Sequence, residues 1–323
     1  MTTFRLTAPS RLHFGLLARG PAAPRQFGGL GLMVEVPGLE IEATPSSSWT
    51  AAGPLAARAL RVAQSVASAL ALGDLRPTPL HFAMRRVPPE HIGLGTGTQL
   101  SLAVAKLVAV SIGMLETCAA DLAALCGRGV RSGVGLHGFD VGGLVVEGGH
   151  KTDGGIAPLL CRLHFPADWS ALVVAPRIAE SLHGAAETLA FAALPPMPEA
   201  ETDRLCRLVL LGLMPAVAEV DLDGFGAALE EIQHRVGSWF APAQGGVFAS
   251  ARLATLVAWL RSEGLRGVGQ SSWGPTIYGF TAEGPDWRSS LLDRLRDRFD
   301  LDGAGLWTTA NRRGAILESM KAN

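Results

Sequence analysis

The stretch Pro88-Pro89-Glu90-His91-Ile92-Gly93-Leu94-Gly95-Thr96-Gly97-Thr98-Gln99 is a glycine-rich turn that leads directly into an apolar segment at residues 100–115. That segment predicts a buried helix, because it contains Lys106 and is shorter than the ~20 residues of a membrane span. Glycines let the turn point its N–H groups inward, and the start of a helix carries partial positive charge, so the unit favours bound phosphate. A glycine turn that only caps the helix is the alternative.

The atoms expected to contact a phosphate are backbone amides, hydroxyl groups and one side-chain amide. They belong to Gly93, Gly95, Thr96, Gly97, Thr98, Gln99 and Ser101. The loop contains no lysine, and it matches neither G-x-x-x-x-G-K-[ST] nor G-x-G-x-x-G. The pattern therefore indicates an anion site without identifying a nucleotide.

A second glycine-rich segment, residues 127–135, carries Arg128 and Arg131. Guanidinium groups can bind an oxyanion through two parallel hydrogen bonds. Asp140, which follows closely, either binds Mg²⁺ through oxygen or pairs with one of the arginines. A solvated turn with a local salt bridge is the alternative to an anion site.

Two further segments carry polar side chains beside apolar strands. Residues 269–276 combine hydroxyl groups, an indole and a proline turn, which favours a ligand loop over an ordinary turn. In the segment 10–15, Arg11 and His13 share one face of a period-2 strand. His13 is a candidate general acid or base or an anion donor, with a structural histidine as the alternative. No Ser-His-Asp or Cys-His pattern supports covalent catalysis.

Strands and helices alternate irregularly, which predicts an α+β fold. The pattern changes near residue 165, so we expect an N-terminal domain at 1–165 and a C-terminal domain at 166–323. Strands are expected at residues 4–8, 12–17, 30–36, 39–43, 79–84, 141–147, 171–175, 265–269, 276–281 and 305–309. Helices are expected at residues 54–72, 100–115, 119–126, 202–217, 221–236, 250–263 and 286–299.

The composition limits the class of protein. A hydrophobic content of 48% with 18% charged residues excludes a disordered chain, and a net charge of −1 argues against nucleic-acid binding by bulk charge. The four cysteines form no C-x-x-C pair, and no signal peptide or membrane span is readable. We therefore expect a cytoplasmic protein that binds no membrane and has no structural metal. Its apolar, weakly charged character favours a homodimer.

Three motifs, taken together and in this order, resemble those of the GHMP kinase superfamily over essentially the whole chain. They are Ala8-Pro9-Ser10-Arg11, the P-x-x-x-G-L-G-T-G loop and the late glycine-rich loop before a strand. The resemblance implies an N-terminal domain like the second domain of ribosomal protein S5 and a ferredoxin-like C-terminal domain. The kinases usually read G-L-G-S-S-A and G-x-G-x-G-G in the second and third motifs, and this chain departs from both.

Those departures, together with Arg11-Leu12-His13-Phe14-Gly15-Leu16, Gly127-Arg128-Gly129 and Gln244-Gly245-Gly246, resemble one branch, the β-ribofuranosylaminobenzene 5'-phosphate synthases. The resemblance implies that 4-aminobenzoate or a close analogue condenses with phosphoribosyl pyrophosphate (PRPP), releasing CO₂ and pyrophosphate, in tetrahydromethanopterin biosynthesis. It also implies Mg²⁺ as the cofactor.

We accordingly expect the phosphate loop with Arg128 and Arg131 to bind PRPP. The expected catalytic residues are Arg11, His13, Ser271 and Ser272, the expected aromatic-acid site is Trp273, Gly274, Thr276 and Gln244, and the expected metal ligand is Asp140. The alternatives are an ATP-dependent GHMP-type small-molecule kinase and a non-catalytic protein that binds a phosphorylated metabolite.

Overall fold

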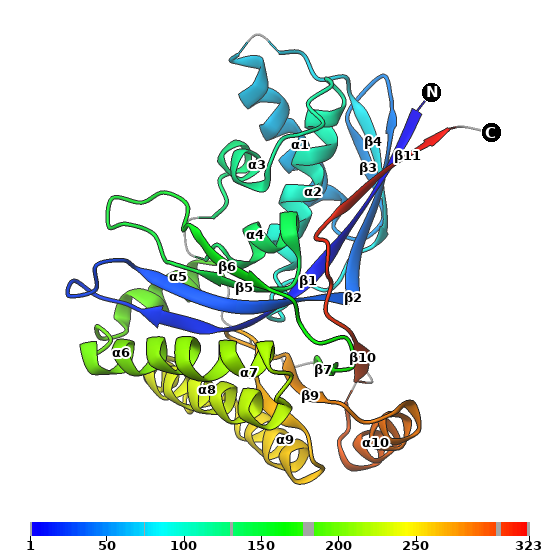
Figure 1. The fold of residues 1–323 in the computed structure, drawn as a ribbon. Helices are drawn as coiled ribbons and strands as arrows, with labels where there is room; N and C mark the ends of the chain where they lie inside the picture. The colour runs from blue at the N-terminus through cyan, green and yellow to red at the C-terminus, as the bar shows by residue number, and fades with distance from the viewer. Residues whose placement is uncertain (1, 74, 130–131, 177–183, 302–304, 322–323) are drawn as a thin grey trace.

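The first layer of the fold is a seven-stranded sheet covered by four helices. The structure, a computed structural model, describes residues 2–73, 75–129, 132–176, 184–301 and 305–321. The sheet order is β11-β1-β2-β4-β3, and β5 and β6 continue it from the far part of β2. The elements are β1 (Thr2–Ala18), β2 (Phe27–Pro45), β3 (Thr50–Ala52), α1 (Ala56–Ala71), β4 (Leu80–Arg86), α2 (Thr96–Val110), α3 (Ala119–Cys126), α4 (Val134–Val141), β5 (Leu144–Glu147), β6 (Leu159–Leu163) and β11 (Ile316–Lys321). Helices α1 to α4 lie on one side of this sheet (Figure 1).

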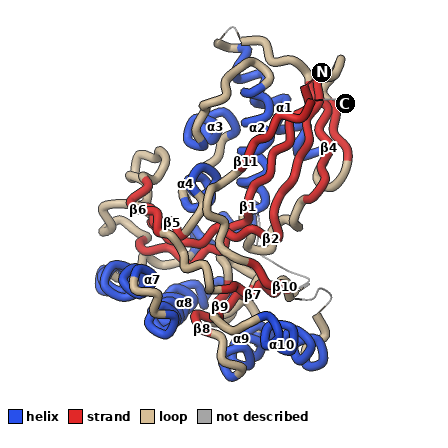
Figure 2. The backbone as a smooth tube through the Cα atoms, turned by 45° about the vertical axis from the view of Figure 1, so that its right-hand side comes forward, coloured by secondary structure: helices blue, strands red, loops and turns tan. Residues whose placement is uncertain are grey.

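The second layer contains a four-stranded antiparallel sheet, β10-β7-β9-β8, with helices around it (Figure 2). Its elements are β7 (Ser170–Val174), α5 (Gly184–Ala193), α6 (Glu199–Leu208), a π-helical turn (Val209–Leu213), α7 (Met214–Ala218), α8 (Leu222–Gln244), α9 (Ala251–Ser262), β8 (Arg266–Gln270), β9 (Ile277–Thr281), α10 (Pro285–Arg298) and β10 (Leu306–Thr308).

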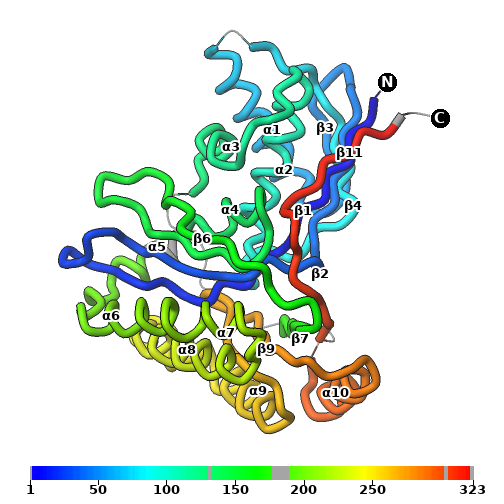
Figure 3. The backbone as a smooth tube through the Cα atoms, viewed as in Figure 1, coloured from blue at the N-terminus to red at the C-terminus, as the bar shows by residue number. Residues whose placement is uncertain are grey.

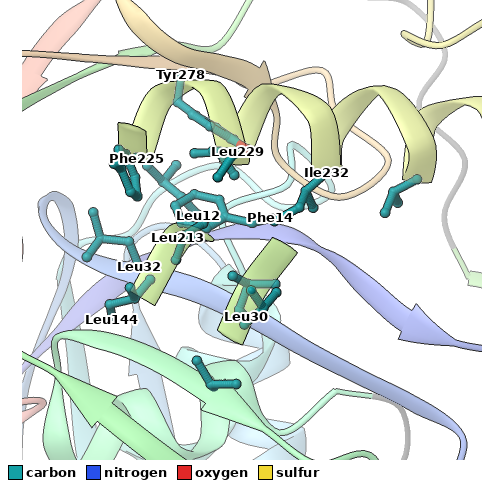
Figure 4. Packing of buried hydrophobic residues seen from close by; sticks show 14 of the residues in the cluster. Leu12, Phe14, Leu30, Leu32, Leu144, Leu213, Phe225, Leu229, Ile232 and Tyr278 are labelled. Atoms are coloured by element: carbon teal, nitrogen blue, oxygen red, sulfur yellow. The ribbon is translucent and has the colours of Figure 1, made fainter. Parts of the chain in front are cut away.

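One apolar core joins the two layers. Leu12 and Phe14 of β1 lie against Phe225 and Leu229 of α8, and Tyr278 of β9 packs 5.1 Å from Phe14 between ring centroids (Figure 4). Side chains alternate along a strand, so burying Leu12 and Phe14 here turns Arg11 and His13 to the opposite face. The packing of β1 on α8 therefore determines where the polar residues of β1 point.

The chain returns to the first sheet at its end. Strand β11 pairs antiparallel with β1, and the two run side by side in Figure 3. The passage from the first sheet to the second lies between β6 and β7. The division into domains at residue 165 stays a prediction. Strand β11, near the C-terminus, pairs with β1 in the sheet of the first half, so the chain crosses between the two sheets more than once.

Several expected elements have other bounds. The four short strands expected before residue 45 form two continuous long strands: residues 4–8 and 12–17 belong to β1, and residues 30–36 and 39–43 belong to β2. The pairing of β1 with β2 shifts at bulges at Ala8/Ser10 and His13/Gly15. The helix expected at 202–217 is α6, the π-helical turn and α7. Helix α8 continues past residue 236 through Pro242. The strand expected from residue 141 begins only at β5, because α4 occupies Val134–Val141. Strands β3, β6 and β11 and helix α5 were not expected from the sequence.

Within the described residues, no helix has the length and apolar character needed to cross a bilayer.

Candidate active site

A cavity of about 440 Å³ opens where the first layer meets the second. Its wall is formed by β1, the loop before α2, the segment before α4, one face of α8 and the turn between β8 and β9. The sequence-predicted residues that line it are Arg11, His13, Gly93, Gly95, Thr96, Gly97, Thr98, Arg128, Gln244, Ser272, Trp273 and Gly274. The structure thus brings five separate sequence motifs together at one cavity.

The glycine-rich loop forms one end of the cavity. Gly93 and Gly95 have φ values of 89° and 72°, and Gly95 immediately precedes the first residue of α2. The helix begins at Thr96, earlier than expected, so Gly97 and Thr98 lie in its first turn. Thr98 N donates to the carbonyl of Gly95 at 3.0 Å, and the amides of Thr96 and Gly97 precede this first bond of the helix. This arrangement provides a site for an anion at the start of a buried helix.

Arg58, on α1, adds a cation to this end that the sequence did not indicate. A β-carbon on Gly97 would lie 2.9 Å from Arg58 Nη2, so the guanidinium lies directly over the loop. Arg58 also forms an ion pair with Glu90, which lies in the loop itself. Both side chains line the cavity. Arg58 therefore places a guanidinium beside a loop that contains no lysine of its own.

Arg128 lines the cavity and is oriented by a chain of two hydrogen bonds. Its Nε donates to Ser101 Oγ at 3.1 Å, and Ser101 Oγ donates to the carbonyl of Gly97 at 2.8 Å. Ser101 is fully buried and does not line the cavity, so its expected contact with phosphate is replaced by support for Arg128. Gln99 is likewise buried and donates to the carbonyl of Gly135 at 2.7 Å. Arg131 lies outside the described residues.

The third loop divides into residues that line the cavity and residues that hold the walls together. Ser271 Oγ accepts from His13 N at 2.9 Å and donates to the carbonyl of Gly93 at 2.6 Å. It is fully buried and does not line the cavity, so its observed contacts hold the walls together, and a catalytic role for Ser271 stays a prediction. Thr276 is also buried, and its backbone N–H donates to the carbonyl of Ile92 at 3.2 Å. The hydroxyl group of Ser271 bonds neighbouring segments, and Thr276 is enclosed, so neither residue lines the cavity.

The other end of the cavity is aromatic. The rings of Phe240 and Trp273 are 4.5 Å apart between centroids, and Phe191 lies edge-on to Trp273 at 5.1 Å. Phe27 lies 5.9 Å from Phe191 and completes the cluster. Gln244 lines the same end. Offset and edge-to-face contacts of this kind suit a planar aromatic ligand.

His13 lines the same cavity. Its Nε2 is 3.1 Å from Ser132 Oγ, which the sequence did not single out. Burial, followed by the nearby charge of Arg11, lowers the pKa of His13 well below its usual value. The imidazole is therefore neutral at neutral pH.

Asp140 has a different role from the one expected. Both of its carboxylate oxygens accept from Ala119 N, at 3.1 and 2.9 Å, so it caps the start of α3 and lies outside the cavity lining. Burial raises the pKa of its carboxyl group. No group of three or more metal-ligating side chains occurs among the described residues. Glu90 is the one carboxylate among the described residues that line the cavity.

Glu147 is the last residue of β5 and is fully buried. Its oxygens accept from Gly149 N at 2.6 Å and from Gly133 N at 3.3 Å. Desolvation exceeds the effect of these bonds and raises the pKa of Glu147 to about 7. Its one signal in the sequence is an acidic residue at the end of the apolar run Leu144–Glu147.

Glu147 should make the stability of the protein depend on pH. Below about pH 4.5 the carboxyl group is protonated in the folded and in the unfolded protein. Between pH 4.5 and about 7 the unfolded chain releases this proton while the folded chain keeps it. The free energy of unfolding should therefore fall by about 3 kcal/mol as the pH rises through this interval, then level off. Chemical denaturation of wild type and Glu147→Gln from pH 4 to 8 measures the difference. Equal slopes in the two proteins would contradict it; exposed Glu283→Gln serves as the control.

Comparisons with known proteins agree with the geometry. No protein-family model matches the chain. A protein of Methanothermobacter thermautotrophicus named beta-ribofuranosylphenol 5'-phosphate synthase is 32% identical over 302 residues, covering 87% of this chain and 89% of that protein. A protein of the same name from Archaeoglobus fulgidus is 32% identical over 331 residues, covering 97% and 99%.

Solved structures support the expected fold. Homoserine kinase from Cytophaga hutchinsonii matches with a TM-score of 0.72 at 17% identity, covering 98% of this chain and 97% of that one. A mevalonate diphosphate decarboxylase from Enterococcus faecalis matches with a TM-score of 0.63 at 15% identity, covering 99% and 100%. The predicted GHMP-kinase-like α+β fold is confirmed.

Proposed function

The chain belongs to the beta-ribofuranosylphenol 5'-phosphate synthase family, an enzyme family, and we propose that it joins the ribose of PRPP to a 4-substituted benzoate with loss of CO₂ and pyrophosphate. One observation carries this proposal: a single cavity is lined by arginines beside a helix N-terminus, by a cluster of aromatic rings and by His13. A donor with two phosphate-bearing groups and a flat apolar acceptor match the arginines and the aromatic rings.

The 4-substituent of the acceptor is a separate part of the proposal. The resemblance seen in the sequence implies an amino group, whereas the name of the relatives contains a phenol. Both substituents push electron density to the ring carbon that bears the carboxylate. We propose 4-hydroxybenzoate as the close analogue to compare with 4-aminobenzoate.

At the cationic end, the groups aimed at the donor are Arg58, Arg128 and the first amides of α2, with Arg11 alongside. When the bond between the anomeric carbon and pyrophosphate breaks, its electron pair stays on the leaving oxygen. Donors that are already in place stabilise this negative charge without reorganisation, which is usually the largest catalytic contribution.

At the aromatic end, Trp273 and Phe240 hold the ring against the ribose. The ring carbon that bears the carboxylate attacks the anomeric carbon, and loss of CO₂ then returns the electron pair to the ring and restores aromaticity. A strong ion pair to the carboxylate would oppose this loss, and apolar surroundings favour it. The aromatic cluster therefore suits both positioning and decarboxylation.

Mg²⁺ is part of the proposal. Mg²⁺ usually takes one or two protein carboxylates and completes its shell with water and substrate phosphates. Glu90 is the carboxylate that would hold the ion, which requires its ion pair with Arg58 to open, whereas Asp140 lies outside the cavity lining and accepts from Ala119 N. When bound, the ion neutralises charge on the pyrophosphate. A homodimer and a cytoplasmic location stay predictions from composition.

The decisive test is incubation with PRPP, Mg²⁺ and carboxyl-labelled 4-hydroxybenzoate or 4-aminobenzoate, following labelled CO₂ and pyrophosphate together. We expect equal amounts of both products with at least one acceptor, and loss of both with a chelator. PRPP binding without release of either product would favour a non-catalytic binding protein. ATP consumption with an alcohol acceptor would favour the kinase alternative.

A further inference from the structure

Arg58 and Glu90 bind each other in the cavity where the donor phosphates are proposed to lie. Arg58 Nη1 donates to Glu90 Oε1, and both side chains line the cavity. The two side chains are 22% and 16% exposed, so water screens the ion pair only in part. The positive charge of Arg58 therefore has an anionic partner within the protein itself.

The same guanidinium lies beside the start of α2. A β-carbon on Gly97, in the first turn of that helix, would lie 2.9 Å from Arg58 Nη2 and 3.4 Å from its Cζ. One terminal nitrogen of the planar group thus binds Glu90, while the other lies at the site expected to bind phosphate. An oxyanion at this helix start competes with Glu90 for Arg58, because a guanidinium binds an oxyanion best through two parallel N–H groups.

The backbone that carries Glu90 is anchored on both sides of it. Thr96 Oγ1 donates to the carbonyl of Pro89 at 2.9 Å, and Thr276 N donates to the carbonyl of Ile92 at 3.2 Å. The residues that flank Glu90 are thus tied to α2 and to the β8–β9 turn. The ion pair can therefore open by rotation of its side chains, without movement of the loop.

The charges around the ion pair determine what can open it. Within the part of the cavity wall that the structure describes, Glu90 is the one carboxylate, and Arg11 and Arg128 are further cations. A phosphate that takes Arg58 from Glu90 leaves two negative groups side by side in a partly enclosed space, where like charges repel more strongly than in water. A divalent cation that arrives with the phosphates removes this repulsion, because the carboxylate and the phosphate oxygens can share it.

We propose that Glu90 selects donors whose phosphates arrive with a divalent cation. Glu90 holds Arg58 until such a complex enters the cavity. Arg58 then binds phosphate oxygens and Glu90 binds the cation, with no change in any covalent bond. A metal-free anion gains Arg58 only by leaving Glu90 uncompensated, so it binds weakly. The inference rests on the proposed function, since it requires a phosphate site at the start of α2.

The test measures the binding of inorganic pyrophosphate by calorimetry, once in EDTA and once with Mg²⁺ in excess. For the wild type we expect Mg²⁺ to tighten binding by about tenfold or more, because it compensates the charge of Glu90. In Glu90→Gln the competing charge is gone, so metal-free pyrophosphate should bind about tenfold or more tighter than to the wild type. Mg²⁺ should give this variant no further gain, because it lowers the negative charge of pyrophosphate.

Arg58→Gln tests the other half of the exchange. If Arg58 binds the phosphates once Glu90 has released it, this variant should weaken binding with Mg²⁺ present by about tenfold or more. Glu263→Gln is the matched control, because Glu263 pairs with Arg294 at 2.7 Å and is 23% exposed, yet lies outside the cavity lining. Its affinities in EDTA and in Mg²⁺ should match those of the wild type.

The two proposals fail separately. Wild-type binding that Mg²⁺ does not tighten overturns the role of Glu90 alone, and this comparison requires no variant to fold. Metal-free affinities that are equal in the wild type and Glu90→Gln overturn it as well, and so does an Arg58→Gln protein that binds as tightly as the wild type with Mg²⁺. No binding of pyrophosphate under either condition contradicts the proposed function and, with it, this inference.

Discussion

Gly93→Ala should destabilise the protein by about 3 kcal/mol or more and lower kcat/KM for PRPP by at least about 100-fold. Gly93 has a φ of 89°, in the left-handed region that side-chain-bearing residues avoid. A β-carbon there would also overlap the carbonyl oxygen of Ser271, which is backbone and cannot rotate away. The loop must therefore separate from the β8–β9 turn.

Separation removes more than one contact. Ser271 Oγ bonds both Gly93 O and His13 N, and Thr276 N bonds Ile92 O, so the loop, β1 and the turn are one hydrogen-bonded unit. A shift of the loop moves the first turn of α2 and His13 away from the bound donor. Misplacement by about 1 Å is enough for losses of this size.

Gly113→Ala is the matched control, because it measures the cost of a positive φ at alanine without a steric clash. Gly113 has a φ of 82°, but a β-carbon there would meet nothing within 4 Å. We expect about 1–2 kcal/mol of destabilisation and unchanged kinetics. Denaturant unfolding and steady-state kinetics of both variants decide the matter. If the two alanines cost the same and both proteins keep wild-type kcat/KM, the loop does not depend on its contact with Ser271.

The sequence-predicted site residues that are easiest to explain are those whose place in the cavity lining has a local cause. Positive φ at Gly93 and Gly95 and the helix that follows them are properties of one short segment, so the loop could be identified without its neighbours. The hydroxyl groups could not be sorted in the same way. Ser101 and Ser272 look alike in sequence, yet helix α2 buries the first and the β8–β9 turn exposes the second to the cavity.

The residues that the sequence did not indicate come from elements placed by tertiary packing. Arg58 is one of several arginines on a helix, and only the packing of α1 beside α2 brings it over Gly97. Glu147 is placed to accept from Gly133 N because β5 pairs with β2, a partner more than a hundred residues away. Strand β11 was missed for the same reason, since its pairing with β1 joins the two ends of the chain.

Arg128→Ala should raise the KM for PRPP by about 30-fold or more, the largest effect expected for a single cation of the site. In the proposed complex Arg128 pairs with a phosphate of PRPP. Removing one partner of such a desolvated charge pair costs roughly 2–5 kcal/mol of binding free energy, and each 1.4 kcal/mol changes the dissociation constant by a factor of about ten. Arg128 reaches the cavity on a partly buried chain of hydrogen bonds through Ser101 to Gly97, so its guanidinium is already oriented before the donor binds. Preorganisation of this kind makes the charge difficult to replace.

The supporting variants should follow in a definite order. Arg128→Lys keeps the charge but loses the bond from Nε and the planar fork, and Ser101→Ala removes the acceptor that orients the guanidinium, so both should raise KM by smaller factors than Arg128→Ala. Arg76→Ala, which removes an exposed arginine bonded to the carbonyls of Ala71 and Leu75, should leave KM unchanged.

With a net charge of −1, the chain has no overall positive field to attract the donor, so the position of the arginines, and not their number, must determine how tightly the donor binds. Equal KM values for Arg128→Ala and Arg76→Ala would contradict this.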